Sequence, residues 1–289
     1  MKYLLSAWTD IARQLREANH ILLLTDYDGT LTPIVEHPDL ANLSENTRII
    51  LQTLARQHRI TLGVISGRAL DDLKEKVGIK GMIYAGNHGL EIEGPGIRFT
   101  NTIAEEFRPF LRIMHYVLER TLSTVKGVFI ENKGLSLSVH YRLADKDRIE
   151  EVGRIVGEVA GDAGAAGKAR IVPGKKVYEV RPTVTWNKGN AIKLLMKKYG
   201  KGGRRSGLFA IYLGDDVTDE DGFKVINNYG IGLSIYVGEE NRQSVAHYYL
   251  YSSIEVANFL TMLLEYIQNR VSVHVPLDEI MREQQIEMT

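Results

Sequence analysis

The sequence predicts an α/β fold with a doubly wound, three-layer core, into which an α+β segment is inserted. Short apolar runs that end in polar residues alternate with amphipathic patterns, as in a parallel sheet covered by helices. One such run, Ile21 to Leu24, leads into Asp26-Tyr27-Asp28-Gly29-Thr30, and another, Phe209 to Leu213, ends at Gly214-Asp215-Asp216. Ligands of such sheets bind outside the carboxyl ends of the strands, so both acidic segments are expected at the functional edge. Taken alone, Asp26 to Thr30 also fits a solvated turn.

Composition excludes several functional classes. The 289 residues include no cysteine, which excludes disulfides, thiolate nucleophiles and cysteine-ligated zinc. The 36 acidic residues balance 36 basic ones, and the basic turn Gly200 to Ser206 is interpreted as a solvated loop, so no nucleic-acid partner is expected. No apolar stretch approaches the length of a membrane span, and Trp8-Thr9-Asp10 interrupts any signal-peptide core. A cytoplasmic location without membrane association is therefore expected. The protein is also expected to be a monomer, although composition does not decide this.

Several core elements precede the inserted segment. Apolar residues at helical spacing predict a helix over residues 3–18, and Ser44 is expected to cap a helix that ends near His58. The apolar run Ile60 to Ile65 predicts a second buried strand, which ends at Ser66-Gly67-Arg68 before a helix that begins near Ala69. A strand, a glycine turn and a helix N-terminus together favour an anion site. The simpler alternative is that Ser66 only caps this helix.

The alternation of short apolar runs that end in polar residues with amphipathic stretches stops near Glu105, and this doubly wound pattern returns after Pro182. We therefore expect a core domain made of residues 1–104 and 183–289, and a separate domain of residues 105–182. The expected elements of this domain are a helix over 107–122, an alternating strand within 129–142, a helix over 147–160, a Gly/Ala-rich connection over 161–167, and one or two strands over 169–181. Beyond it, Asn187 is expected to cap a helix that begins at Lys188, and a last helix is expected over 253–269.

Four stretches fall at one edge of the predicted sheet and have complementary chemistry: Asp26 with Asp28, Ser66, Lys188, and Asp215 with Asp216. Carboxylates at strand ends can hold Mg²⁺, while Ser66 and Lys188 supply a hydroxyl and a cation for phosphate. A carboxylate that attacks a phosphate dianion at ~4 Å meets about 8 kcal/mol of repulsion at an effective dielectric near 20. Cations offset this repulsion, so Asp26 is predicted to be the nucleophile. Asp28 is predicted to donate and then accept the proton.

In order and spacing, these stretches resemble the four motifs of the haloacid dehalogenase superfamily over nearly the whole chain. The resemblance implies that magnesium is held by the Asp26 carboxylate, the Asp28 carbonyl and Asp215, with either Asp216 or Asp219 in support. It also implies that residues 105–182 form a cap domain that determines substrate specificity.

Longer strings resemble trehalose-6-phosphate phosphatases, among them Gly86-Asn87-His88-Gly89, Lys176-Val177-Tyr178-Glu179 and Trp186-Asn187-Lys188-Gly189. This resemblance implies a phosphoric monoester hydrolase that converts trehalose 6-phosphate to trehalose and phosphate, with a separate synthase as the partner activity. The substrate-binding residues that it implies are Thr30, Gly67, Arg68, Asn87 and His88 on the core side, and Arg142, Lys176 and Glu179 on the cap, with Lys175 as the alternative to Lys176.

Other interpretations remain open at this point. The substrate could instead be sucrose 6-phosphate or mannosyl-3-phosphoglycerate, a phosphomutase would use the same aspartate pair, and a sugar-phosphate sensor would bind without turnover. Among the cap residues, Lys176 and Glu179 could form only an exposed ion pair worth less than about 1 kcal/mol, and His88 could be a structural loop residue.

Overall fold

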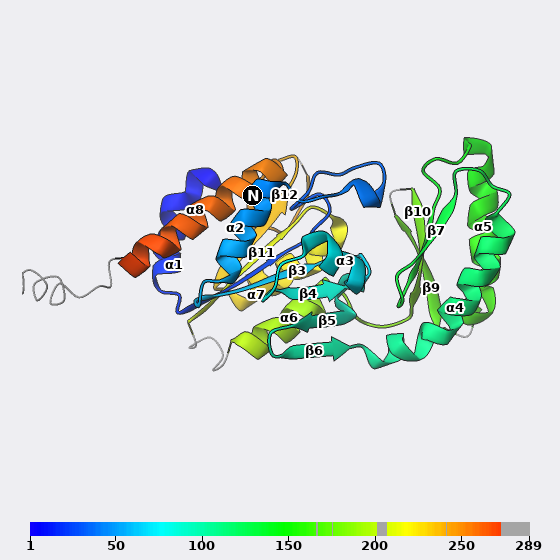
Figure 1. Cartoon of the computed structure of the whole chain (residues 1–289), viewed down its shortest axis with the longest axis horizontal. Coiled ribbons are helices and arrows are strands. Elements are labelled where there is room, and N and C mark those ends of the chain that lie inside the picture. Colours follow the sequence, from blue (N-terminus) through cyan, green and yellow to red (C-terminus); the bar gives the residue numbers. More distant parts are fainter. Residues whose placement is uncertain (166, 175, 201–206, 241, 273–289) are drawn as a thin grey trace, which may run out of the picture. The chain divides into compact units, whose positions relative to one another are not determined.

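A computed structural model of the chain describes residues 1–165, 167–174, 176–200, 207–240 and 242–272 (Figure 1). The chain forms two compact units: unit 1 consists of residues 1–62, 79–81 and 198–289, and unit 2 of residues 63–78 and 82–197. Unit 2 therefore combines the inserted segment with neighbouring parts of the predicted core. The division into a core of 1–104 and 183–289 and a cap of 105–182 stays a prediction.

Unit 1 is built on parallel strands in the order β1-β13-β12-β11-β2. Their bounds are β1 Lys2–Tyr3, β2 His20–Thr25, β11 Leu208–Gly214, β12 Gly232–Val237 and β13 Tyr248–Leu250. Next in the sheet comes β3 (Ile60–Ile65), whose first half belongs to unit 1 and whose second half belongs to unit 2. Strands β2 and β11 are almost wholly buried, as expected for apolar runs covered on both faces.

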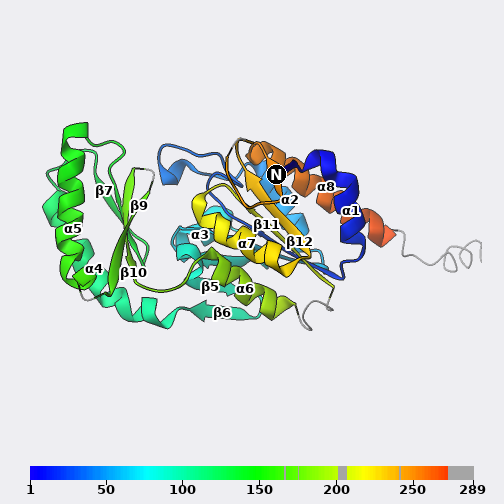
Figure 2. The same cartoon turned by 180° about the vertical axis from the view of Figure 1, so that it is seen from behind.

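Helices cover both faces of the unit 1 sheet, as Figures 1 and 2 show from opposite sides. Helices α2 (Glu45–Ala55) and α8 (Ser253–Ser272) lie on one face, and α7 (Glu220–Tyr229) lies on the other. The predicted Ser44 cap is confirmed by a hydrogen bond of 3.1 Å from Thr47 N to Ser44 Oγ.

The prediction of one helix over residues 3–18 is wrong at its start. Backbone hydrogen bonds from Lys2 N to His247 O and from Leu4 N to Tyr249 O tie residues 2–4 to β13. A 3₁₀ turn, Leu5–Ala7, follows, and helix α1 spans only Trp8–Arg16. Strand pairing with a distant segment thus overrides the local helical pattern.

In unit 2, β3 is followed in the sheet by β4 (Ile83–Gly86), β5 (Glu91–Gly94) and β6 (Ile97–Thr100). Strands β5 and β6 pair antiparallel and form a hairpin around Gly94-Pro95-Gly96. Helix α3 spans Leu70–Val77, and α6 spans Lys188–Tyr199. The Asn187 side chain accepts a hydrogen bond of 3.0 Å from Asn190 N, which confirms the predicted cap of α6.

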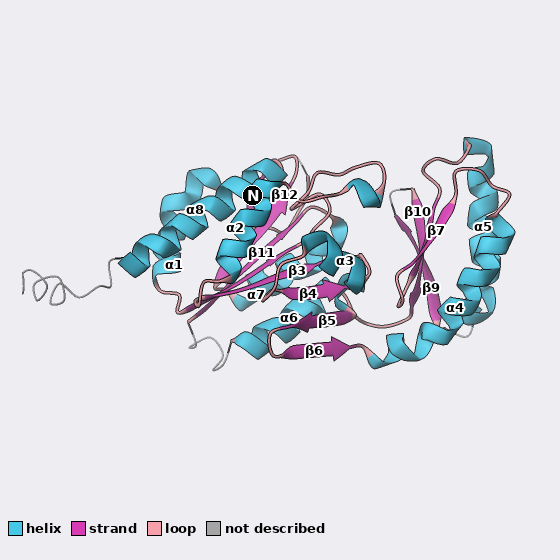
Figure 3. Cartoon of the chain, viewed as in Figure 1, coloured by secondary structure: helices cyan, strands magenta, loops and turns pink. Residues whose placement is uncertain are grey.

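A second, antiparallel sheet in unit 2 has the order β7-β8-β10-β9, and Figure 3 shows α4 and α5 beside it. The bounds of these elements are β7 Phe129–Asn132, β8 Leu137–His140, β9 Ala169–Gly174, β10 Val177–Pro182, α4 Thr102–Leu122 and α5 Ile149–Ala165. The separate sheet, together with the parallel one, confirms the predicted fold class.

Two details of this sheet differ from the prediction. The single strand expected within 129–142 is wrong: β7 and β8 form a hairpin, closed by a hydrogen bond of 2.9 Å from Lys133 N to Ser136 O. Gly134 adopts a φ of 79°, which favours glycine and lets the chain reverse there. The expected 161–167 connection is also partly wrong, since α5 continues to Ala165. Alanine favours helix strongly enough to offset the neighbouring glycines.

Candidate active site

The register of two neighbouring strands brings the acidic segments of unit 1 together. Thr25 of β2 pairs with Leu213 of β11, and Asp26 N donates a hydrogen bond of 2.8 Å to Leu213 O. The next residues of both strands therefore leave the sheet at the same edge. The sequence-based expectation that Asp26 and Asp215 lie close together is confirmed.

The loop after Asp26 passes directly against the Asp215 carboxylate. A Cβ atom on Gly29, which has a φ of 87°, would lie 2.3 Å from Asp215 Oδ2, so only glycine fits here. The Tyr27 hydroxyl, which is buried, anchors the loop by donating a hydrogen bond of 3.0 Å to Ala41 O. Within the described part of the chain, the buried Thr30 Oγ1 has no hydrogen-bond partner. A buried hydroxyl of this kind is able to donate to a bound anion.

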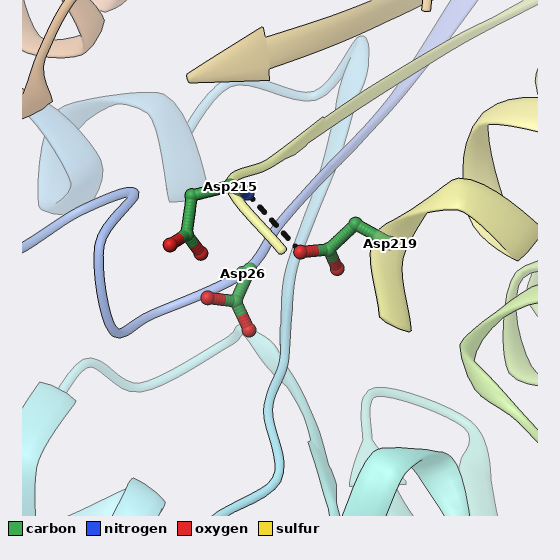
Figure 4. A group of neighbouring side chains, drawn as sticks. All are labelled: Asp26, Asp215 and Asp219. Atoms are coloured by element: carbon green, nitrogen blue, oxygen red, sulfur yellow. Dashed lines mark hydrogen bonds between the residues drawn. The ribbon is translucent and has the colours of Figure 1, made fainter. Parts of the chain in front are cut away.

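Three buried carboxylates form what we call the carboxylate cluster, namely Asp26, Asp215 and Asp219 (Figure 4). One oxygen from each lies within 4.8 Å of the others. Asp219, in the 3₁₀ turn Val217–Asp219, accepts hydrogen bonds from the backbone N–H groups of Asp215 (3.1 Å) and Asp216 (3.0 Å). Its other oxygen accepts a hydrogen bond of 2.5 Å from the Tyr212 hydroxyl. Burial, and then the nearby carboxylates, raise the pKa of Tyr212 well above its usual value, so this phenol stays a donor.

The other two predicted metal ligands, Asp216 and Asp28, are less buried than the three members of this cluster. Asp216 has a side chain that is 46% exposed, lies 3.6 Å from Arg242 and helps to cap the turn that contains Asp219. Asp28 is half-buried, and its backbone forms an isolated bridge with Thr32. Between the alternatives Asp216 and Asp219, it is Asp219 that the structure groups with Asp26 and Asp215.

The donor set of the carboxylate cluster fits a divalent cation. Three formal negative charges lie close together and buried, and hard carboxylate oxygens are ligands that Mg²⁺ accepts. Asp219 accepts hydrogen bonds from two backbone N–H groups and a phenol. In this arrangement Asp26 and Asp215 would supply the direct ligands. Asp219 would hold the Asp215 backbone in place.

In unit 2, the Ser66-Gly67-Arg68 segment packs against His88. A Cβ atom on Gly67 would lie 2.8 Å from the His88 ring, and His88 N donates a hydrogen bond of 2.8 Å to Ser66 O. Ser66 is 1% exposed and its hydroxyl accepts a hydrogen bond of 3.2 Å from Arg68 N. It is not the cap of α3, because the N-cap residue is Ala69, so the simpler alternative is wrong. The Arg68 guanidinium donates a hydrogen bond of 2.8 Å to Asp72.

Alternation along the antiparallel strands places polar side chains on one face of the four-stranded sheet. Glu131, Ser138 and Glu179 are cross-strand neighbours, whereas Ile130, Val139 and Tyr178 alternate with them and pack on the core with α4 and α5. We call the polar set the sheet-face cluster; its members are Glu131, Lys133, Ser138, His140, Glu179 and Arg181.

Glu179 is the centre of the sheet-face cluster. Its Oε1 accepts hydrogen bonds from Lys133 Nζ (3.1 Å) and Ser138 Oγ (3.3 Å), and its Oε2 accepts one from Arg181 Nε (2.5 Å). Burial raises the pKa of Glu179, but Lys133, His88 and Arg181 outweigh burial and hold it well below its usual value. Glu179 is 9% exposed, so the alternative of an exposed ion pair with Lys176 is wrong.

His88 adjoins this cluster as a neutral imidazole. Burial, and the charges of Arg181 and Lys188, lower its pKa to about 4, although the neighbouring Glu179 opposes the shift. The Arg181 guanidinium lies 2.6 Å from His88 Nε2, and a neutral imidazole accepts this hydrogen bond there. Of the described residues, none forms a hydrogen bond with the buried His88 Nδ1.

Glu131 and His140 form the other end of the sheet-face cluster. They interact at 2.9 Å, and the His140 ring stacks on Phe129 with 4.3 Å between ring centroids and 6° between ring planes. Burial raises the pKa of Glu131, but the hydrogen bond from His140 and the charges of Lys133, His140 and Arg68 outweigh it and lower the pKa. Carboxylates, an ammonium group and an aromatic face together can bind a polyol by hydrogen bonds and ring contact.

The remaining predicted residues of unit 2 have different environments. Lys188 is the first residue of α6 and is 3% exposed. Arg142 and Lys176 are exposed, and Lys176 has a φ of 66°. Lys175 lies outside the described residues. The roles of Arg142 and Lys176 as sugar contacts stay predictions.

Sequence reasoning assigned no role to Lys133, Arg181 or Arg242. For Lys133 and Arg181 the sequence did contain an indication. Polar residues alternate with other residues at Glu131 and Lys133 and again at Glu179 and Arg181, which places each pair on one face of a strand. Arg242 donates a hydrogen bond of 2.9 Å to Asp215 O and so supports the loop of the carboxylate cluster. No sequence pattern marks it.

The fold places the chain in the class of haloacid dehalogenase-like folds. The structure of a haloacid dehalogenase-like hydrolase from Bacteroides thetaiotaomicron matches with a TM-score of 0.58 at 19% identity over 84% of this chain and 99% of that one. Within this class, the chain belongs to the trehalose-phosphatase family, whose model matches residues 24–254. It is therefore a phosphatase, as the sequence predicted.

Individual relatives agree with this assignment. A probable trehalose-phosphate phosphatase 3 of Oryza sativa subsp. japonica is 34% identical over 274 residues, which cover 90% of this chain and 73% of the relative. The C-terminal domain of a C. albicans trehalose-6-phosphate phosphatase matches with a TM-score of 0.74 at 27% identity, over 89% of this chain and 96% of that one. Among the described residues, no helix has the length and apolar character required to cross a membrane.

Proposed function

We propose that this protein hydrolyses trehalose 6-phosphate to trehalose and phosphate through a covalent phosphate ester on Asp26. The observation that carries the proposal is the carboxylate cluster at the ends of β2 and β11, in a chain that matches the trehalose-phosphatase family over residues 24–254. The pattern of buried charge supports a reaction that begins with a carboxylate and requires a cation.

In the proposed reaction, an Asp26 oxygen attacks phosphorus and the bond from phosphorus to the sugar oxygen breaks. Asp28 gives its proton to the leaving oxygen, and trehalose departs. Asp28 then takes a proton from water, whose oxygen attacks phosphorus, and the bond from phosphorus to Asp26 breaks to release phosphate. Mg²⁺, held by Asp26, Asp215 and the Asp28 carbonyl, would supply positive charge against the phosphate oxygens.

The residues around phosphate are assigned by their chemistry. Lys188 would add a fixed positive charge, and Ser66 and Thr30 would add hydroxyl donors. The buried, unpartnered hydroxyl of Thr30 supports its assignment, because a bound phosphate would satisfy it. The backbone of Gly67 and the side chain of Arg68 would flank the phosphate.

The sheet-face cluster would bind the sugar that does not carry phosphate. Lys133, Glu179 and Arg181 are held by one another, so their hydrogen-bonding directions are fixed before substrate arrives. His88 would present its free Nδ1 as a donor to a sugar hydroxyl. A separate synthase would supply the substrate. The protein would act in the cytoplasm and as a monomer.

A panel of phosphate esters tests this function. Phosphate release would be measured with trehalose 6-phosphate, sucrose 6-phosphate, mannosyl-3-phosphoglycerate, glucose 6-phosphate and p-nitrophenyl phosphate, each with Mg²⁺ and after chelation. We expect kcat/KM to be highest for trehalose 6-phosphate and turnover to stop on chelation. Preference for a monosaccharide phosphate would contradict the substrate, and no turnover of any ester would favour a sensor.

A further inference from the structure

Asn87 begins the 3₁₀ turn Asn87–Gly89 and is deeply enclosed. It is 1% exposed, and its φ of 49° lies in the left-handed region that asparagine adopts more readily than most residues. Its backbone N–H donates a hydrogen bond of 2.8 Å to Arg68 O. The backbone of Asn87, from which the side chain extends, is therefore anchored to Arg68.

The Asn87 amide is occupied by protein groups. Its Nδ2 donates to Lys133 O at 2.8 Å and to Glu91 Oε2 at 3.1 Å, and its Oδ1 accepts from Ser136 Oγ at 2.8 Å. The opposite amide orientation would direct Oδ1 at a carbonyl and a carboxylate, which are both acceptors, so this orientation is the favourable one. Both amide hydrogens are thus used, and Asn87 has no donor left for a sugar.

These hydrogen bonds join both ends of the turn between β7 and β8. Lys133 N donates to Ser136 O at 2.9 Å, so Asn87 bridges the two residues that close the turn. The same Lys133 extends its ammonium group to Glu179 Oε1 at 3.1 Å and is 9% exposed. A shift of the turn would move this ammonium group.

We propose that Asn87 is a positioning residue for sugar binding: it fixes the Lys133–Ser136 turn, and through it the ammonium group of Lys133, instead of contacting the substrate. The inference rests on the proposed function, in which Lys133 and Glu179 bind the second sugar. It replaces the direct substrate contact expected for Asn87 from the sequence.

The matched control lies in the same turn. The Asn132 side chain accepts a hydrogen bond of 2.9 Å from Gly134 N on the exposed side of the turn. Asn132→Ala therefore removes one asparagine hydrogen bond to the turn and leaves those of Asn87 in place. Ser136→Ala removes a single hydrogen bond to Asn87 and serves as a milder second variant.

Steady-state kinetics of the full chain with Mg²⁺ would compare trehalose 6-phosphate with p-nitrophenyl phosphate, which has no sugar. For Asn87→Ala we expect KM for trehalose 6-phosphate to rise about tenfold, with kcat and p-nitrophenyl phosphate turnover nearly unchanged. We expect a rise of about threefold for Ser136→Ala and less than about twofold for Asn132→Ala.

A double-mutant cycle separates positioning from contact. In a Lys133→Met background, Asn87→Ala should have little further effect on KM, because the group that it positions is gone. An undiminished effect in that background overturns the proposal, and so does an equal loss with p-nitrophenyl phosphate. If Asn87→Ala does not fold, an unchanged KM in Ser136→Ala overturns it instead. Failure of the wild-type chain to hydrolyse trehalose 6-phosphate would refute the proposed function itself.

Discussion

The carboxylate cluster and the sheet-face cluster differ in the groups that surround their carboxylates. In unit 1, three carboxylates of like sign lie within 4.8 Å of one another. In unit 2, the carboxylates Glu131 and Glu179 are paired with Lys133, His140 and Arg181. Carboxylates that lie together can hold a cation, whereas the carboxylates of unit 2 are paired with cationic side chains in one network.

This difference indicates that the two clusters are suited to different functions. A group of carboxylates that lie together is suited to chemistry at a charged group with the help of a metal ion. A balanced cluster with fixed donors and acceptors is suited to recognising an uncharged polyol. The following experiments, from the largest expected effect to the smallest, test whether the two clusters really differ in this way.

Asn in place of Asp26 should abolish turnover and leave the fold intact. Asp26→Asn removes the attacking oxygen charge, so kcat should fall by at least about 1,000-fold. Phosphate release at saturating Mg²⁺ checks this, with circular dichroism as the test of folding. Asp10→Asn, an exposed aspartate of unit 1, is the control and should keep full activity. Full hydrolysis by Asp26→Asn would show that another group is the nucleophile.

Replacement of Glu179 should destabilise the protein as well as weaken sugar binding. Glu179→Gln leaves Lys133 and Arg181 buried without their carboxylate, at a cost of about 3–5 kcal/mol. Urea unfolding measures this cost. The control is Glu158→Gln, which breaks the exposed Arg154–Glu158 pair and should cost at most about 0.5 kcal/mol. Equal costs for the two variants would mean that the sheet-face cluster is not a buried network.

His88 should make stability depend on pH in a defined window. The folded protein lowers the pKa of His88 to about 4, so the unfolded chain binds this proton first as the pH falls. The contribution is fully present above about pH 6.5, is lost as the pH falls toward 4, and amounts to about 3 kcal/mol. The low pKa of Glu179 adds a separate loss, which begins only below about pH 4.5.

Unfolding free energies between pH 7 and pH 4.5 test this dependence. His88→Gln, which keeps an acceptor for Arg181, should flatten the curve over this range. His58→Gln, at an exposed histidine, should leave it unchanged. If the unfolding free energy of wild type and of His88→Gln changed with pH by the same amount over this range, His88 would not be held neutral in the folded protein.

The smallest effect is expected from the Tyr212 hydroxyl. Tyr212→Phe removes one hydrogen bond to the buried Asp219 and should cost about 2 kcal/mol of stability. It should also weaken Mg²⁺ binding about tenfold, because Asp219 holds the backbone of Asp215. Calorimetric titration with Mg²⁺ checks this, with Tyr116→Phe, at an exposed tyrosine, as the control. Unchanged binding would exclude a role of Tyr212 in shaping the carboxylate cluster.

Much of unit 1 could be predicted because its pattern is local. Apolar runs define β2 and β11, and the polar residues that follow them lie at the strand ends in any parallel sheet. The hairpin of β7 and β8 was mistaken for one strand, because the alternation continues through Leu135 and hides the turn. Leu135 packs with Leu90, Ala104 and Val184, a separate cluster from the core under the four-stranded sheet.

The sequence by itself determined which residues stand at the strand ends, and therefore the position of Asp26 and Asp215 and the class of chemistry. The tertiary structure alone decided which polar groups satisfy one another. Asn87 meets Lys133 across 46 residues, Lys133 meets Glu179 across another 46, and Arg181 meets His88 across 93. Periodicity assigns a side chain to a face, but a buried polar group requires a specific partner, and only the folded chain brings that partner within hydrogen-bonding distance.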